Sequence, residues 1–162
     1  MKRHIFFVIA AIGLSIVAFG QRLPNVELKT LQGKILSTSS IENNGKPILI
    51  SFWATFCKPC IKELNALNDN YPDWKKETGV RIIAVSTDDS RSMARVAPFV
   101  ASNGWTFDVY CDPNSDFKRA MNVVNIPHMF LIDGKGNIVW QHNSYVDGDE
   151  VVIYQKIKEL IK

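Results

Sequence analysis

The sequence predicts a single α/β domain in which a central mixed β-sheet is flanked by helices. Short apolar runs rich in branched residues alternate with longer stretches whose apolar residues recur at helical spacing, so strands and helices should follow one another along the chain. The apolar run at 48–53 leads directly into such a helical stretch. Residues 128–132 and 138–141 flank the turn sequence Asp-Gly-Lys-Gly-Asn, which predicts an antiparallel hairpin near the end.

The first 20 residues resemble a secretory signal peptide in their composition. Lys2 and Arg3 are basic, residues 5–19 are almost wholly apolar, and Ala18 and Gly20 provide the small residues that a signal peptidase needs. The apolar run of about 15 residues is shorter than the ~20 of a membrane-spanning helix, so we expect cleavage rather than an uncleaved anchor. The mature domain would then be 21–162, in an oxidising compartment such as a bacterial periplasm.

The mature domain is nearly neutral. The chain has 19 Lys and Arg against 16 Asp and Glu, and removal of Lys2 and Arg3 leaves 17 against 16. We therefore expect neither nucleic acid nor an anionic membrane as a partner, and we expect a monomer with one core.

The first half of the domain begins with a small cap. Residues 26–28 and 35–36 should form a hairpin around Gln32-Gly33, followed by a polar loop. After the strand at 48–53, a helix is predicted over about 59–77 because Ile61, Leu64, Leu67, Tyr71 and Trp74 share one face; it should end at Thr78-Gly79.

The second half continues the alternation. Residues 80–86 are rich in branched side chains and should form a buried strand. A helix is expected over 91–103, with a kink or break at Pro98. The remaining predicted elements are a strand at 107–110, a helix at 115–121, the hairpin at 128–141 and a helix at 151–160.

Two cysteines lie two residues apart where the strand at 48–53 meets its helix. Cys57 should stand at the helix N-terminus and Cys60 one turn inside. Unpaired N–H groups and the helix dipole favour a thiolate at Cys57, and Lys58 adds a positive charge beside it. Pro59 is tolerated because the first helical turn has no intrahelical partner for the missing N–H. The pattern indicates a redox site.

Two other interpretations explain the cysteine pair less well. A structural staple across so short a loop would remove little chain entropy. A zinc site normally has four ligands, and the other candidates do not pair at ligand spacing: Cys111, His4, His128 and His142. We expect no metal, and no cofactor besides the Cys57–Cys60 disulfide itself.

Three segments together resemble one known family. Trp53-Ala-Thr-Phe-Cys-Lys-Pro-Cys60 is similar to the active-site signature of thioredoxin-fold proteins, and Asn125-Ile-Pro-His128 resembles their cis-proline loop. The segment 91–110 and the cap around Leu31-Gln-Gly-Lys34 resemble the exported TlpA/ResA-like thiol-disulfide oxidoreductases. The resemblance implies a thioredoxin-like fold with an N-terminal cap and an inserted helix–strand segment.

The resemblance also implies a mechanism of disulfide exchange. Cys57 would be the exposed attacking thiolate and Cys60 would resolve the mixed disulfide. Pro127, after a cis bond, would lie beside the dithiol. The resemblance places substrate contacts at Trp53, Phe56, Lys58, Pro59 and Ile126, the last through its backbone.

The sequence departs from the family at two positions near the motif. Phe56 replaces the Trp that often precedes the first cysteine, and Ser51 stands where thioredoxin has a buried Asp on the preceding strand. Another group must then handle the proton of Cys60. Glu63, one helical turn after Cys60, matches an acidic position of ResA-like proteins and is our candidate, with a solvated helix position as the alternative.

Two further residues need an explanation. We expect His128 to pack or hydrogen-bond rather than to contact the dithiol or the substrate. Cys111 is expected to be a buried inert thiol, the alternative being a third redox partner.

The sequence favours a periplasmic oxidoreductase that reduces disulfides of exported proteins with electrons from a membrane or periplasmic donor. Exported proteins are oxidised by default, so a dedicated dithiol is most useful as a reductant. A disulfide oxidase or isomerase is the close alternative. A peroxiredoxin-like thiol peroxidase is disfavoured because Ala54 stands where such enzymes need Thr or Ser, and the intact cysteine pair argues against a non-enzymatic binding module.

Overall fold

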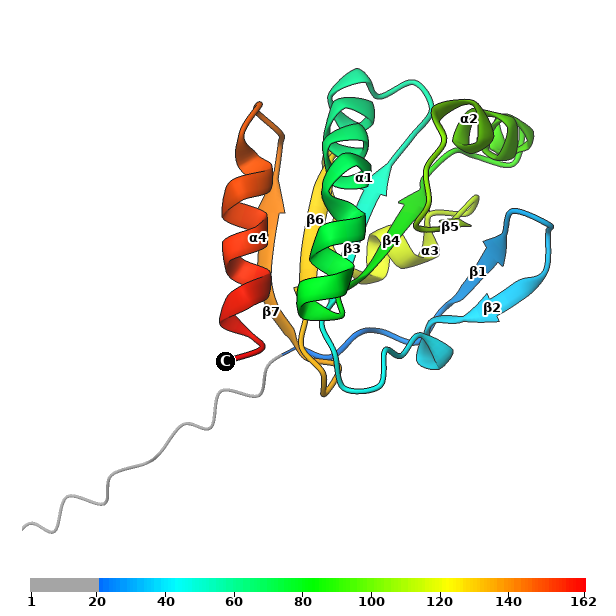
Figure 1. The fold of residues 1–162 in the computed structure, drawn as a ribbon. Helices are drawn as coiled ribbons and strands as arrows, with labels where there is room; N and C mark the ends of the chain where they lie inside the picture. Colours follow the sequence, from blue (N-terminus) through cyan, green and yellow to red (C-terminus); the bar gives the residue numbers. More distant parts are fainter. Residues whose placement is uncertain (1–20) are drawn as a thin grey trace, which may run out of the picture.

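A seven-stranded mixed β-sheet with helices on both faces forms the domain in the computed structural model, which describes residues 21–162 (Figure 1). The strands are β1 (Glu27–Thr30), β2 (Ile35–Ser37), β3 (Ile48–Trp53), β4 (Arg81–Ser86), β5 (Asp108–Cys111), β6 (His128–Ile132) and β7 (Ile138–Asn143). The α-helices are α1 (Lys58–Thr78), α2 (Val96–Asn103), α3 (Asp116–Ala120) and α4 (Asp149–Glu159), and the 3-10 helices are η1 (Thr38–Ser40) and η2 (Met93–Arg95).

The predicted signal peptide lies outside the described residues. Within 21–162, no helix combines the length and the apolar character needed to cross a membrane.

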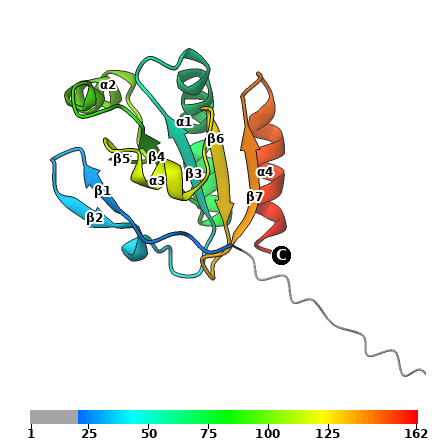
Figure 2. The ribbon, with the colours of Figure 1, turned by 180° about the vertical axis from the view of Figure 1, so that it is seen from behind.

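The sheet separates two apolar clusters. Helices α1 and α4 lie on one face and α3 lies on the other, as the two opposite views show (Figures 1 and 2). Side chains alternate along β3, so that Leu49 and Trp53 join the cluster under α1 while Ile50 and Phe52 join the one under α3. This double coverage explains why every residue of β3 is buried.

Strand order and direction bring several loops to one edge of the sheet. The order is β2-β1-β5-β4-β3-β6-β7. Strands β3, β4 and β5 are parallel, and β6 runs antiparallel to β3. The carboxyl ends of β3 and β4 therefore lie beside the amino end of β6. We call this the disulfide edge, because the segment 54–60 leaves β3 there.

The predicted fold class is confirmed, and the elements differ only in detail. The helix expected over 91–103 is divided into η2 and α2, and Pro98 lies in the first turn of α2, where its missing N–H leaves no helical bond unmade. Helix α4 begins at Asp149, two residues earlier than expected, because the acidic residues Asp149 and Glu150 suit a first turn. The polar loop after β2 holds η1, capped by the Ser37 side chain.

Candidate active site

A disulfide joins Cys57 and Cys60 at the start of α1, with an S–S distance of 2.00 Å. Cys57 is the N-cap, and its sulfur accepts a hydrogen bond from the Cys60 backbone N–H at 3.3 Å. Cys57 is 8% exposed whereas Cys60 is 0% exposed. We expected Cys57 to be exposed, and its exposed fraction is smaller than that expectation implies. Of the two bonded cysteines, however, only Cys57 has any accessible surface.

The residues around the disulfide divide into exposed and buried ones. Phe56 is 76% exposed, and Lys58 and Pro59 are exposed as well. These three side chains surround the one accessible cysteine with an apolar surface that carries one positive charge. The family resemblance implied substrate contacts at these three residues, and all three are exposed beside Cys57.

Trp53 lies elsewhere than we expected. It is 0% exposed and packs on Trp105 and Phe99, with ring centroids 4.8 and 5.7 Å away. The pleat of β3 points this side chain into the cluster under α1, and the segment containing α2 covers it. Trp53 supports the loop from below, and its side chain is not available for substrate contact.

The Pro127 loop lies at the same edge. The Ile126–Pro127 peptide bond is cis, Pro127 is buried and Ile126 is half-buried. His128 pairs with Phe52, so Pro127 stands level with the end of β3. The Pro127 carbonyl oxygen accepts a hydrogen bond from the Ser144 N–H at 3.0 Å, which joins this loop to the one between β7 and α4.

Glu63 is buried under the sheet rather than solvated, with 1% exposed. Its Oε1 accepts a hydrogen bond from the Ser51 hydroxyl at 2.6 Å, and its Oε2 has no hydrogen-bond partner among the described residues. Burial raises the pKa of Glu63 to about 7; the Ser51 hydrogen bond opposes this rise and the negative charge of Asp149 adds to it. A carboxyl group with such a pKa can exchange protons near neutral pH.

A second buried carboxyl group, Asp88, was missed by the sequence reasoning. It lies two residues beyond β4, is 0% exposed, and accepts hydrogen bonds from the Thr55 N–H at 2.9 Å and the Thr55 hydroxyl at 2.6 Å. Thr55 belongs to the loop that carries Cys57. One feature of the sequence could have identified Asp88: it follows the end of β4, which is parallel to β3, so it lies at the same edge of the sheet as the loop after β3.

His128 and Cys111 have the places that we expected. His128 stacks on Phe130 at 4.6 Å between ring centroids, and its Nε2 is 3.3 Å from Gln141 Oε1. Burial lowers the pKa of His128. Cys111 is 2% exposed, and burial raises the pKa of its thiol to about 11, as suits an unreactive thiol.

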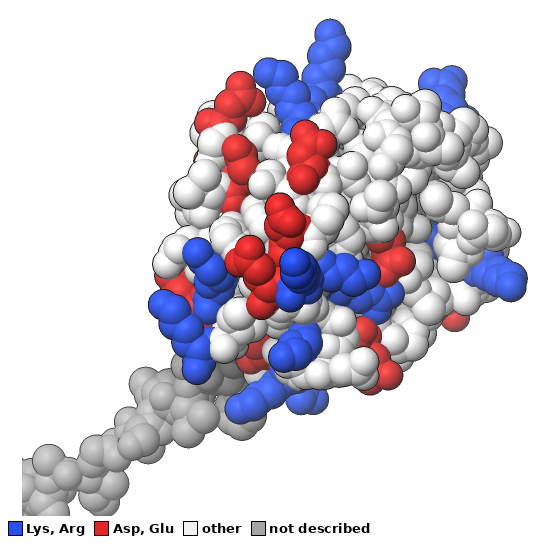
Figure 3. All heavy atoms as spheres, in the orientation of Figure 1, with Lys and Arg blue, Asp and Glu red and all other residues white. Residues whose placement is uncertain are grey.

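The surface beside the disulfide is shallow and of mixed charge. A hollow of about 480 Å³ next to the start of α1 is lined by Lys58, Pro59, Lys62, Tyr145, Val146 and Asp147. Over the face that carries α1 and α4, basic and acidic side chains are interspersed (Figure 3). A partner approaching here meets local charges rather than a field of one sign.

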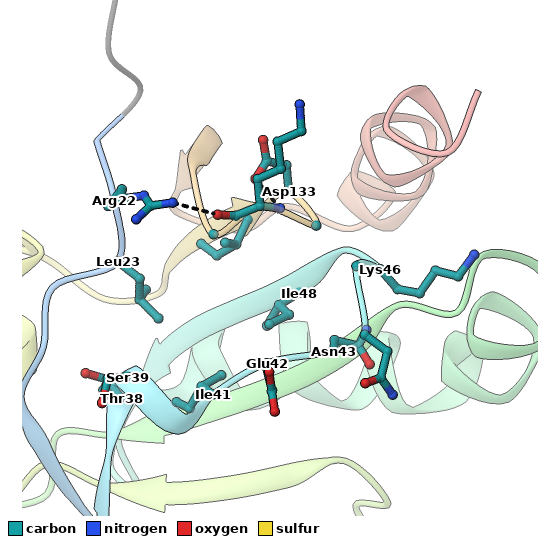
Figure 4. A pocket seen from close by; sticks show the side chains of 16 residues that line it. Arg22, Leu23, Thr38, Ser39, Ile41, Glu42, Asn43, Lys46, Ile48 and Asp133 are labelled. Atoms are coloured by element: carbon teal, nitrogen blue, oxygen red, sulfur yellow. Dashed lines mark hydrogen bonds between the residues drawn. The ribbon is translucent and has the colours of Figure 1, made fainter.

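A separate hollow of about 360 Å³ lies at the opposite edge of the sheet, where β3 begins at Ile48 and β6 ends at Ile132 (Figure 4). Arg22 reaches across its rim to the carbonyl oxygen of Lys135 at 3.4 Å. None of the predicted site residues lines it. Within 21–162, moreover, no three His, Cys, Asp or Glu side chains converge as a metal site would require.

Comparison with known proteins agrees with this geometry. The model of the AhpC/TSA family matches residues 19–141. Thiol-disulfide oxidoreductase ResA of Bacillus thuringiensis subsp. konkukian is 34% identical over 137 residues, which cover 85% of this chain and 76% of that protein. ResA of Bacillus subtilis is 32% identical over 127 residues, or 78% and 68% of the two chains.

Solved structures give the same result. An uncharacterized thioredoxin-like protein from Porphyromonas gingivalis is 50% identical, with a TM-score of 0.77 over 86% of this chain and 91% of the other. A putative thiol:disulfide interchange protein DsbE from Chlorobium tepidum is 26% identical, also with a TM-score of 0.77, over 88% and 97%. The chain therefore belongs to the AhpC/TSA family of thioredoxin-like proteins and is a thiol-disulfide oxidoreductase of the ResA type.

Proposed function

We propose that the protein is exported and reduces disulfides of other exported proteins through Cys57 and Cys60. The observation that carries the proposal is the bonded cysteine pair at the start of α1, in which Cys57 caps the helix and is the more exposed partner. Signal-like residues at the N-terminus support export, and the exposed Phe56 and Pro59 support a protein rather than a small molecule as substrate.

The reaction begins with the reduced protein. The Cys57 thiolate attacks one sulfur of the substrate disulfide, forms a mixed disulfide, and expels the other substrate sulfur as a thiolate that takes up a proton. The N–H groups of the first turn of α1 stabilise the attacking thiolate. The small accessible surface at Cys57 limits this step to a substrate segment that can approach closely.

Resolution requires Cys60 to lose its proton. Glu63, one turn along α1, is the proton acceptor in this proposal, because its raised pKa suits exchange with a thiol near neutral pH. The Cys60 thiolate then attacks Cys57, the second substrate sulfur leaves and is protonated, and the Cys57–Cys60 disulfide forms. Two electrons pass to the substrate, and a dithiol donor outside the chain must return the protein to its reduced form.

The same geometry argues against peroxidase chemistry. Ala54 has no hydroxyl three residues before Cys57, and the neighbouring Thr55 hydroxyl donates to Asp88. A hydroxyl free to hold a peroxide is therefore lacking within the loop 54–56.

A trapping experiment tests the proposal. In cells that make Cys60→Ser, the mixed disulfide at Cys57 cannot be resolved, and exported proteins should accumulate in covalent complexes that dithiothreitol releases. Cys57→Ala is the matched control and should trap nothing. Trapping by both variants, or by neither, contradicts the proposed roles of the two cysteines.

A further inference from the structure

We infer that Asp88 is a positioning residue: it clamps the loop 54–56 so that Phe56 and Cys57 are presented to a protein substrate in one arrangement. The inference rests on the proposed role of Cys57 as the attacking residue. It concerns a carboxylate that the exchange reaction itself does not use.

The clamp consists of hydrogen bonds from two sides of the loop. The Thr55 backbone N–H donates to Asp88 Oδ2 at 2.9 Å, and the Thr55 hydroxyl donates to Asp88 Oδ1 at 2.6 Å. Thr55 therefore donates a hydrogen bond to each of the two carboxylate oxygens of Asp88, as in a bidentate pair. Such an arrangement fixes the direction as well as the distance of Thr55.

Asp88 is itself held firmly. The Ser86 hydroxyl donates to Asp88 Oδ2 at 2.7 Å, and the Asp88 N–H donates to the Ser86 hydroxyl at 3.1 Å. Ser86 is the last residue of β4 and pairs with Trp53 in the register of the sheet. The carboxylate is thus anchored on a central strand, next to the strand from which the loop departs.

The neighbouring Thr87 secures the start of the loop. Its N–H and its hydroxyl donate to the Trp53 carbonyl oxygen at 2.8 and 3.1 Å. The loop then closes on itself, because the Cys57 N–H donates to the Ala54 carbonyl oxygen at 3.0 Å. Thr55 and Phe56 are the two central residues of this turn, so fixing Thr55 fixes where Phe56 points.

Phe56 is 76% exposed, so the position of its backbone depends on this hydrogen-bonded turn more than on burial of its side chain. A buried carboxylate that accepts three strong hydrogen bonds costs much to disturb, because removal of a donor leaves it less well satisfied. The burial of Asp88 at 0% exposed also makes direct contact with a substrate impossible, which is why it positions rather than reacts.

The decisive variant is Thr55→Val, which removes the hydroxyl bond without changing any charge or the backbone donor. Its matched control is Thr78→Val at the far end of α1, where the buried Thr78 hydroxyl donates to the Trp74 carbonyl oxygen at 2.7 Å. Asp88→Asn forms a second pair with Asp112→Asn, since Asp112 is 1% exposed and accepts the Asp116 and Lys118 N–H groups of α3. The measurement is kcat/KM for reduction of insulin disulfides with dithiothreitol as donor.

Thr55→Val and Asp88→Asn should each lower kcat/KM about tenfold, within the roughly hundredfold that a 1 Å displacement of reacting groups can cost. The double variant should be no slower than Asp88→Asn alone, because the two residues act as one unit. Thr55→Ser, which keeps the hydroxyl, should restore the parent value. Thr78→Val and Asp112→Asn should lose stability but retain kcat/KM.

Parent-like activity of Thr55→Val, or equal losses in Thr55→Val and Thr78→Val, would overturn the clamp. If Asp88→Asn does not fold, the Thr55 series decides alone. Failure of the proposed function would look different, because Cys57→Ala would then retain insulin reduction whatever the Thr55 variants do.

Discussion

Two buried carboxyl groups flank the cysteine pair, and their hydrogen bonding gives them different properties. Asp88 accepts three hydrogen bonds through its side chain, whereas Glu63 accepts one, from Ser51. Neither forms a salt bridge within residues 21–162. Burial raises the pKa of Glu63 to about 7, which suits the proton exchange with Cys60 that we propose.

Ser51 has a clear role in this arrangement. Its hydroxyl points from β3 to Glu63 on α1, so strand and helix together place a carboxyl group beneath the site. The sequence identified Ser51 only as the position where thioredoxin has an Asp. The structure shows that a carboxyl group still lies against this position, supplied by the helix instead of the strand.

Glu63→Gln should change how stability depends on pH. The folded-state pKa of about 7 lies above the ordinary value of 4.5 for a glutamate. The folded state therefore binds more protons between these two values, and stability falls as pH rises from 4.5 to 7. The shift corresponds to roughly 3 kcal/mol for this buried group. In the oxidised protein, where no Cys57 or Cys60 thiol titrates, Glu63→Gln should remove this loss.

The measurement is urea unfolding of parent and variant at pH 5 and pH 8. The difference in unfolding free energy between the two pH values should be smaller in Glu63→Gln than in the parent. The unfolding free energy of the variant, relative to that of the parent, should therefore be higher at pH 8 than at pH 5. A parallel pH dependence in both proteins would mean that Glu63 has an ordinary pKa and is unsuited to accept a proton from Cys60.

At the scale of elements, the strands and helices were largely predictable because each carries its own pattern. Strand β3 matches the predicted 48–53 since both of its faces are covered and its sequence is continuously apolar. The positions of Cys57, Cys60 and Glu63 at the start of one helix were also predictable, because they depend only on residues close together in the sequence. The contacts of Thr55 with Asp88 and of Trp53 with Trp105 were not, because they join residues more than 30 positions apart through packing that the sequence alone does not specify.

The turn between β6 and β7 depends on a close approach of two chain segments. A Cβ added to Gly134 would overlap the carbonyl oxygen of Gly45, in the loop before β3. We expect Gly134→Ala to lower the unfolding free energy by about 2–3 kcal/mol, the cost of forcing apart well-packed atoms. Thermal or urea unfolding measures this.

Gly136→Ala in the same turn is the control. It meets no atom within 4 Å, so its cost comes only from its φ of +84° and should be about 1 kcal/mol. Both variants should keep the parent kcat/KM for disulfide reduction, since the turn lies at the edge opposite the disulfide. Equal destabilisation by the two substitutions would contradict this prediction. It would show that the segment around Gly45 can move away from a Cβ at position 134 with no loss of stability.

At the scale of the whole molecule, redox state and folding stability are linked, and this link provides a test of the proposed direction of the reaction. Folding and reduction form a thermodynamic cycle, so the form that the fold stabilises is the form that the active site prefers. A strong disulfide oxidant has a stabilised reduced form. A reductant, the function proposed for this protein, should have the opposite balance and be more stable when Cys57 and Cys60 are joined.

We therefore predict that the oxidised protein unfolds at a higher urea concentration than the reduced one. The experiment uses Cys111→Ala, so that Cys57 and Cys60 form the only possible disulfide in the unfolded chain. Loop closure over so few residues contributes little by itself, which means that a large difference must come from the folded site. For this two-electron couple, each 1.4 kcal/mol of difference corresponds to about 30 mV in reduction potential. Greater stability of the reduced form would contradict the reductant role and favour a disulfide oxidase.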